Sequence, residues 1–213
     1  MSLYQTEQRQ SKTTRILVYP NITFAKDLEK DSYIQVIKKQ ITLLNEIRDD
    51  LWFYLILPKE VPSLAFDNVT QLIVYLPTHS PTMRAHFDTE AIKKVLPREY
   101  DFDLVMCHLP EHAYDLKNVL FNKTQHVPKF FGYAHWIDFK EVVNWQMDSF
   151  NKSMIGLLEY DKCYINTQHQ KEMVLKQAEE IFNSDTLYKL SNILEVQHIG
   201  VDSKDIVSDI NKE

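Results

Sequence analysis

Glycine is the residue that this sequence most conspicuously lacks. The 213 residues include only three glycines, Gly132, Gly156 and Gly200, whereas average usage of about 7% would give roughly 15. A Walker loop and a G-x-G-x-x-G fingerprint both need clustered glycines, because the backbone must approach phosphate closely. The sequence therefore excludes a standard nucleotide-binding loop of either type, and we predict neither a cofactor nor a metal ion bound to this chain.

Long runs of basic or apolar residues are also missing. The formal net charge is −6 and no long basic run occurs, which disfavours nucleic acid as a partner. No apolar run approaches the roughly 18 residues that a transmembrane segment needs, and the polar start "MSLYQTEQRQSKTTR" does not resemble a signal peptide. We therefore expect a soluble, cytoplasmic protein, and we expect Cys107 and Cys163, which lie in apolar runs, to be buried thiols.

The segments that are present alternate between strand and helix patterns. Short apolar runs predict strands at 15–20, 51–58, 70–77, 101–110, 129–136, 162–167 and 193–200. Between most of them lie helical patterns, at 31–50, 88–96, 111–121, 150–160 and 168–182. This alternation predicts an α/β fold, a Rossmann-like open parallel sheet of six or seven strands with helices on both faces.

The same pattern predicts the limits of a single domain. Residues 1–13 read as a disordered N-terminus, 14–201 as the Rossmann-like domain, and 202–213 as a polar tail resembling an interdomain linker. Within the first predicted helix, apolar side chains recur at steps of three and four residues, which places one face toward the core. These positions are Ile34, Ile37, Ile41, Leu44 and Ile47.

Polar and aromatic residues follow several predicted strands, where open α/β sheets bind their ligands. Asn21 follows the first strand, His108 ends the fourth, and His135, Trp136 and Asp138 end the fifth. A neutral imidazole can take a proton from a hydroxyl near pH 7, and a carboxylate can orient it. His135 and Asp138 are therefore the candidate catalytic residues, although both have an alternative role as caps of neighbouring segments. Trp136 is either a platform for a sugar ring or base, or part of the core.

The segment "HLPEH", from His108 to His112, matches the reversed zinc-protease motif H-x-x-E-H. That motif needs both histidines on one helix. Pro110 suits the first turn of a helix, so we expect the two histidines on different elements. A polar rim of the same cleft, or simple surface residues, are preferred to a zinc site.

Three segments together resemble the N-terminal domain of a GT-B glycosyltransferase. "FDLVMCH" (102–108) resembles the strand in which these enzymes carry Asp-(apolar)-His, and "FFGYAHWID" (130–138) resembles their next strand, which ends in a His at the interdomain cleft. "EVQHIGVDSKDI" (195–206) resembles the closing strand and the handover to the second domain. The resemblance covers roughly residues 15–206.

The resemblance implies roles for the candidate residues. His135 would face the transferring sugar, as a base in an inverting enzyme or as a hydrogen-bond donor in a retaining one. Asp138 and His108 would line the acceptor side. The predicted acceptor-binding residues are Asn21, His108, Glu111, His112 and Trp136.

The chain departs from the family at two places. The first loop reads "PNITF" (20–24), without the glycines that commonly stand there. The family holds its nucleotide-sugar donor mainly on a C-terminal domain, so the resemblance implies an acceptor-side half that works with a C-terminal donor-binding domain or a partner polypeptide. The acceptor would be a saccharide, lipid or protein. A non-catalytic α/β binding or assembly module and an unrelated hydrolase or metal enzyme are the alternatives.

Overall fold

The computed structural model describes residues 13–20, 32–58, 64–74, 87–96, 101–121, 127–135, 137 and 146–198. The side chains of residues 32, 58 and 146–148 are outside this description. The predicted disordered start (1–13) and polar tail (202–213) fall almost entirely outside the described residues.

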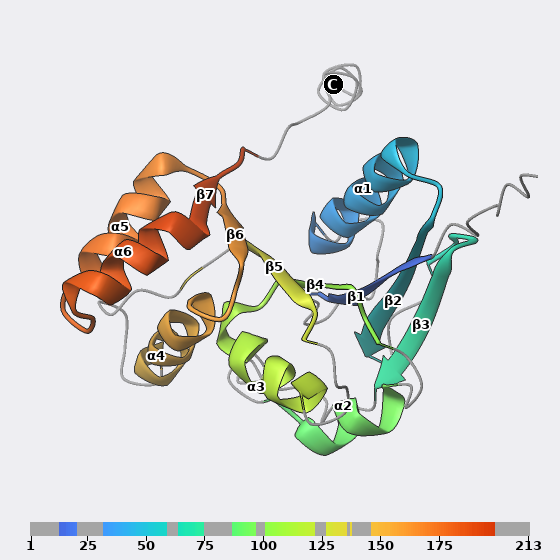
Figure 1. The fold of residues 1–213 in the computed structure, drawn as a ribbon, viewed down its shortest axis with the longest axis horizontal. Coiled ribbons are helices and arrows are strands. Elements are labelled where there is room, and N and C mark those ends of the chain that lie inside the picture. The colour runs from blue at the N-terminus through green and yellow to red at the C-terminus, as the bar shows by residue number, and fades with distance from the viewer. Residues whose placement is uncertain are drawn as a thin grey trace, which may run out of the picture.

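A seven-stranded parallel sheet organises the described part of the chain (Figure 1). Its strand order is β3-β2-β1-β4-β5-β6-β7. The chain therefore adds β2 and β3 on one side of β1 and then adds β4 to β7 on its other side. The strands are β1 (Thr14–Tyr19), β2 (Leu51–Pro58), β3 (Val69–Val74), β4 (Leu104–Cys107), β5 (Lys129–Ala134), β6 (Lys162–Ile165) and β7 (Leu194–Val196). The α/β prediction is thus confirmed.

One face of the sheet is covered by α1 (Ser32–Ile47) (Figure 1). Ile34, Ile37 and Ile41 are buried there against apolar side chains of β1 and β2. The predicted apolar face is correct for these residues. Ile47 was predicted on it but is 77% exposed, because it is the last residue of the helix and lies beyond the packed part of this face.

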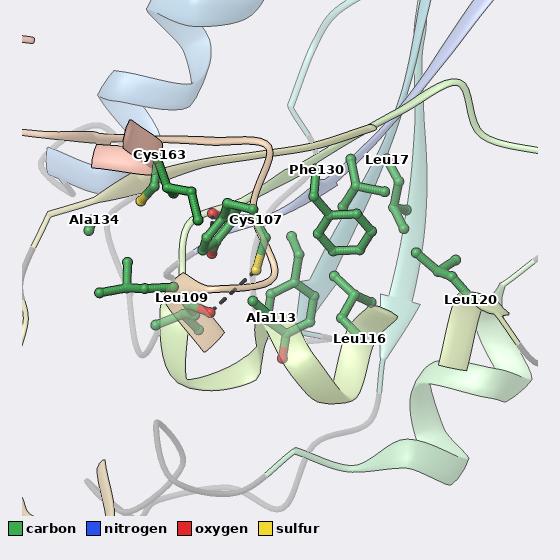
Figure 2. Close-up of a cluster of buried hydrophobic side chains, with 14 of the residues drawn as sticks. Leu17, Cys107, Leu109, Ala113, Leu116, Leu120, Phe130, Ala134 and Cys163 are labelled. Atoms are coloured by element: carbon green, nitrogen blue, oxygen red, sulfur yellow. Dashed lines mark hydrogen bonds between the residues drawn. The ribbon is translucent and has the colours of Figure 1, made fainter. Parts of the chain in front are cut away.

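The other face carries the remaining helices, α2 (Thr89–Val95), α3 (Pro110–Phe121), α4 (Gln146–Leu157), α5 (Gln168–Ala178) and α6 (Ser184–Ile193). Figure 2 shows part of this core, where Leu17 of β1 and Phe130 of β5 lie close to Leu116 of α3. Alternate strand residues point into it, which is the period expected of a strand. Both cysteines are free and buried, as predicted.

Glycine stands where the core allows no side chain. A Cβ on Gly132 of β5 would lie 2.5 Å from the ring of Tyr160, whose hydroxyl donates a hydrogen bond to the Cys107 carbonyl at 3.0 Å. A Cβ on Gly156 of α4 would lie within 1.8 Å of the Pro110 carbonyl oxygen. The two glycines therefore permit close packing of Tyr160 on β5 and of α4 on α3.

The segment 168–182, predicted as one long helix, is different in the structure. The helix α5 ends at Ala178, and a separate helix, α6, occupies 184–193 before β7. Asn183 begins α6, because its side-chain oxygen accepts a hydrogen bond from the backbone N–H of Thr186 at 3.0 Å. The sequence prediction missed this second helix.

Candidate functional site

Two histidines meet at the carboxyl edge of the sheet. His108 follows β4 and His135 follows β5, and these strands are neighbours, with Cys107 opposite Gly132. The Nδ1 atom of His108 lies 3.1 Å from the Nε2 atom of His135, within hydrogen-bonding distance. The rings are stacked, with centroids 5.4 Å apart and an angle of 20° between planes. We call His108 and His135 the histidine pair.

Burial keeps the histidine pair uncharged. His108 is only 2% exposed, and its pKa is lowered to about 3 by burial and by the neighbouring His135. His135 is partly exposed, and burial lowers its pKa to about 4. Both imidazoles are therefore neutral at pH 7, when each carries a single N–H and a single lone pair on its ring nitrogens.

Aromatic and amide side chains surround His135. The Tyr133 ring lies 4.6 Å from it, and Tyr33, in the first turn of α1, meets it edge-on at 4.9 Å. Asn166, just after β6, donates a hydrogen bond from Nδ2 to the His135 carbonyl oxygen at 3.1 Å. The Tyr133 hydroxyl lies 2.6 Å from Asn166 Oδ1 and 3.0 Å from the Gln197 carbonyl oxygen. The ends of β5, β6 and β7 thus fix the backbone of His135 and the Tyr133 ring that lies beside its imidazole.

A cavity of about 270 Å³ lies between α1 and the sheet, beside the histidine pair. His108 contributes to its wall. Most of the other walls are apolar or aromatic, and two glutamines add polar groups. The lining residues besides His108 are Gln40, Leu43, Leu44, Met106, Phe131, Gly132, Tyr133, Tyr164 and Gln197. A cavity of this size and character suits an apolar or ring-shaped group of a small molecule.

Glu111 and His112 lie apart from the histidine pair. Both are in the first turn of α3 and are 2–3% exposed. The Nδ1 atom of His112 lies 3.0 Å from the Tyr19 hydroxyl, and its ring contacts Phe87. Tyr19 belongs to the core under α2 and α3, whereas His108 faces α1. His108 and His112 therefore lie on different elements, as predicted, and the structure does not bring them together.

Both cysteines have properties of structural thiols. Burial raises the pKa of Cys107 to about 12 and raises that of Cys163 as well. The Cys107 thiol donates to the Leu109 carbonyl oxygen at 3.3 Å. Since the thiolate is the nucleophile, neither residue is suited to nucleophilic catalysis.

Three predicted site residues, Asn21, Trp136 and Asp138, lie outside the described residues. Conversely, the sequence analysis did not select Tyr33, Tyr133 or Asn166. Asn166 could have been found, because it follows a strand at the same edge of the sheet as His108 and His135. Tyr33 carries no such signal, since it contacts His135 only through the packing of α1.

No protein-family model matches the chain, and no curated protein matches it significantly. Among the described residues, no group of three or more His, Cys, Asp or Glu side chains is placed to hold a metal ion. In the same part of the chain, no helix is long and apolar enough to span a membrane.

Proposed function

We propose that this chain is the acceptor-side domain of a GT-B-type glycosyltransferase, with His135 at the reacting centre. The observation that carries the proposal is a neutral, partly exposed imidazole at the carboxyl edge of a parallel sheet, held by a second imidazole. That edge is where open α/β sheets bind ligands. The resemblance of segments 102–108, 130–138 and 195–206 to this family supports the same role.

In the proposed reaction, the acceptor hydroxyl oxygen attacks the anomeric carbon of a nucleotide-sugar. The hydroxyl proton goes to His135, and the nucleoside diphosphate leaves with the electron pair of the broken C–O bond. The low pKa keeps His135 unprotonated at pH 7, but it makes His135 a weak base in the chain alone. A negatively charged donor brought to this edge would raise that pKa, because a nearby opposite charge favours imidazolium, and would thereby strengthen the base.

The cavity beside His108 gives the acceptor a place on this domain. Its tyrosines and apolar side chains suit the apolar face of a sugar ring or an acyl chain. The donor is expected on a C-terminal domain or partner polypeptide, because this chain lacks the glycines of a phosphate-binding loop. We therefore expect negligible transfer by the chain alone, since one half of a cleft does not exclude water from the reaction.

A pull-down with this chain as bait, followed by a nucleotide-sugar transfer assay, tests the proposal. A co-purifying donor-binding polypeptide with transfer activity is the expected result. His135→Ala should then reduce transfer at least about 100-fold, the range of a lost general base, while the circular dichroism spectrum stays unchanged. His169→Ala, on the exposed start of α5, is the matched control and should retain transfer. Full turnover by the His135→Ala complex would refute the assignment.

If the chain is instead a non-catalytic binding or assembly module, the same experiment should give a different result. A partner would be recovered, but the complex would transfer no sugar and His135→Ala would not alter its assembly.

A further inference from the structure

We propose that His108 is a positioning residue that fixes the tautomer of His135, so that the Nδ1 atom of His135 is presented as a bare proton acceptor. This inference rests on the proposed function for its catalytic meaning, but the hydrogen-bond arrangement itself is testable without it. Nothing in the sequence pattern assigns this role, because His108 and His135 are 27 residues apart.

The contact between the two rings allows only two arrangements. Nδ1 of His108 and Nε2 of His135 lie 3.1 Å apart, and a hydrogen bond between them needs one hydrogen on one of the two nitrogens. Because both rings are neutral, placing that hydrogen fixes every other ring nitrogen. Either both rings carry Nε2–H, and His135 donates to His108, or both carry Nδ1–H, and His108 donates to His135.

The first arrangement, with Nε2–H on both rings, is the more stable of the two. The neutral imidazole of a histidine side chain prefers the Nε2–H tautomer, and in this arrangement both rings adopt it. The reverse arrangement places both rings in the less stable Nδ1–H form. Within the described residues, Nδ1 of His135 makes no competing hydrogen bond, so nothing there offsets this preference. The pair therefore selects Nε2–H on His135 and leaves its Nδ1 lone pair bare.

The position of the hydrogen decides what His135 does. With Nδ1 bare, His135 accepts the proton of an acceptor hydroxyl and becomes imidazolium, while its Nε2–H continues to donate to His108. A base at this place belongs to direct, inverting transfer. The reverse arrangement would make His135 a hydrogen-bond donor through Nδ1–H, which suits retaining transfer. The inference thus deepens the proposed function by naming Nδ1 of His135 as the atom that takes the hydroxyl proton in direct, inverting transfer.

Ring-nitrogen NMR of the ¹⁵N-labelled chain at pH 7 tests the inference, because protonated and bare ring nitrogens have well-separated chemical shifts. Loss of signals in His135→Gln assigns the residue. We expect Nε2 of His135 protonated and Nδ1 bare. In His108→Leu, which removes the acceptor, the two nitrogen shifts of His135 should move toward each other as the tautomers exchange. In His108→Asn, whose amide oxygen replaces the Nδ1 acceptor, the wild-type shifts should be largely restored.

Two results would overturn the inference. One is an Nδ1–H signal for His135 in the wild-type chain, and the other is an unchanged His135 spectrum in a folded His108→Leu variant. If that variant does not fold, the wild-type spectrum and His108→Asn still decide. His169→Leu, at an exposed histidine, controls for general effects and should leave the His135 signals in place. An Nδ1–H signal combined with transfer lost in His135→Ala would overturn only this inference and leave the proposed function standing.

Discussion

At the scale of single residues, Asn166 shows how a residue at the carboxyl edge of the sheet supports the candidate site through its hydrogen bonds. Its amide has an acceptor and a donor on the same carbon, so it can bind two groups of the neighbouring strand at once. Here Oδ1 receives the Tyr133 hydroxyl and Nδ2 donates to the His135 carbonyl. Asn166 therefore fixes the backbone from which the His135 ring projects, although it does not contact that ring through a hydrogen bond.

A double-mutant cycle on Tyr133 and Asn166 measures this link. Tyr133→Phe and Asn166→Ala should each lower the free energy of unfolding by about 1 kcal/mol, the net value of one hydrogen bond. Because both changes remove the same 2.6 Å contact, the double variant should lose about 0.5–1 kcal/mol less than the sum. Urea unfolding supplies the values. Additive losses would show that the contact contributes nothing, and Tyr188→Phe, 72% exposed, is the neutral control.

At the scale of elements, the sequence was sufficient for the sheet and for most helices. Strands such as β2, LWFYLILP, are apolar at nearly every position because both faces are covered, and among its described side chains, 51–57, only Trp52 is notably exposed. The helix α1 shows its period because one side packs on the sheet. The helix α6 was missed because residues 179–182, Glu-Glu-Ile-Phe, extend the helical pattern of α5 as far as Asn183, the cap of α6. The helix could have been predicted from the three-residue spacing of its apolar side chains, Leu187, Leu190 and Ile193.

The candidate site was harder to predict than the elements. The positions of His108 and His135 at strand ends followed from the sequence, but their contact depends on strand order and register, with Cys107 opposite Gly132. Strand order and register depend on pairing between segments far apart in the sequence, and the periodicity of apolar residues within one segment does not predict them. The predicted rim residues Glu111 and His112 instead face the core, because Pro110 starts α3 and its first turn packs against Tyr19 and Phe87.

Gly156 gives a sharp test of how α3 and α4 pack. Its backbone conformation is open to any residue, but its Cβ would lie 1.8 Å from the Pro110 carbonyl oxygen, a backbone atom that cannot rotate away. Alanine is favoured over glycine in a helix by about 1 kcal/mol. We nevertheless expect Gly156→Ala to lower the free energy of unfolding by on the order of 3 kcal/mol, because overpacking forces the helices apart.

Urea denaturation of Gly156→Ala beside Ile155→Ala checks this expectation. Ile155 is the preceding residue of α4 and is 48% exposed, so its truncation should change stability by less than about 1 kcal/mol. A Gly156→Ala protein as stable as the wild type would mean that α3 and α4 do not approach as closely as described.

At the scale of the whole molecule, the histidine pair couples stability to pH. The folded chain holds two imidazoles whose pKa values, about 3 and about 4, lie below the ordinary value of 6.5. Unfolding returns both to water, where they bind protons at pH 5. Between about pH 6.5 and 4 the unfolded chain therefore binds more protons than the folded chain, and the free energy of unfolding must fall as the pH falls.

We expect each histidine of the pair to remove about 2 kcal/mol of stability between pH 7 and pH 5. That is a large fraction of the roughly 5–15 kcal/mol that stabilises an ordinary domain. Urea titrations at pH 7, 6 and 5 measure it directly. The contribution should be fully present above about pH 6.5 and should decline steadily below it.

Asp161 does not affect stability in this pH window. Its pKa is lowered by hydrogen bonds from Phe130 and Lys129 despite its partial burial, so its contribution to stability is lost only as the pH falls below its ordinary value of 3.8.

The double variant His108→Leu/His135→Leu isolates the pair from every other group that titrates. It removes both imidazoles while keeping apolar volume between β4, β5 and α1, so its stability should depend less on pH between 7 and 5 than that of the wild type, by about 4 kcal/mol. Parallel pH dependences in the two proteins would mean that the two histidines bind protons equally in the folded and unfolded chains, so that folding does not lower their pKa values. That result would limit the neutral hydrogen-bonded pair to pH values above about 6.5, since two charged imidazoles have no lone pair to share.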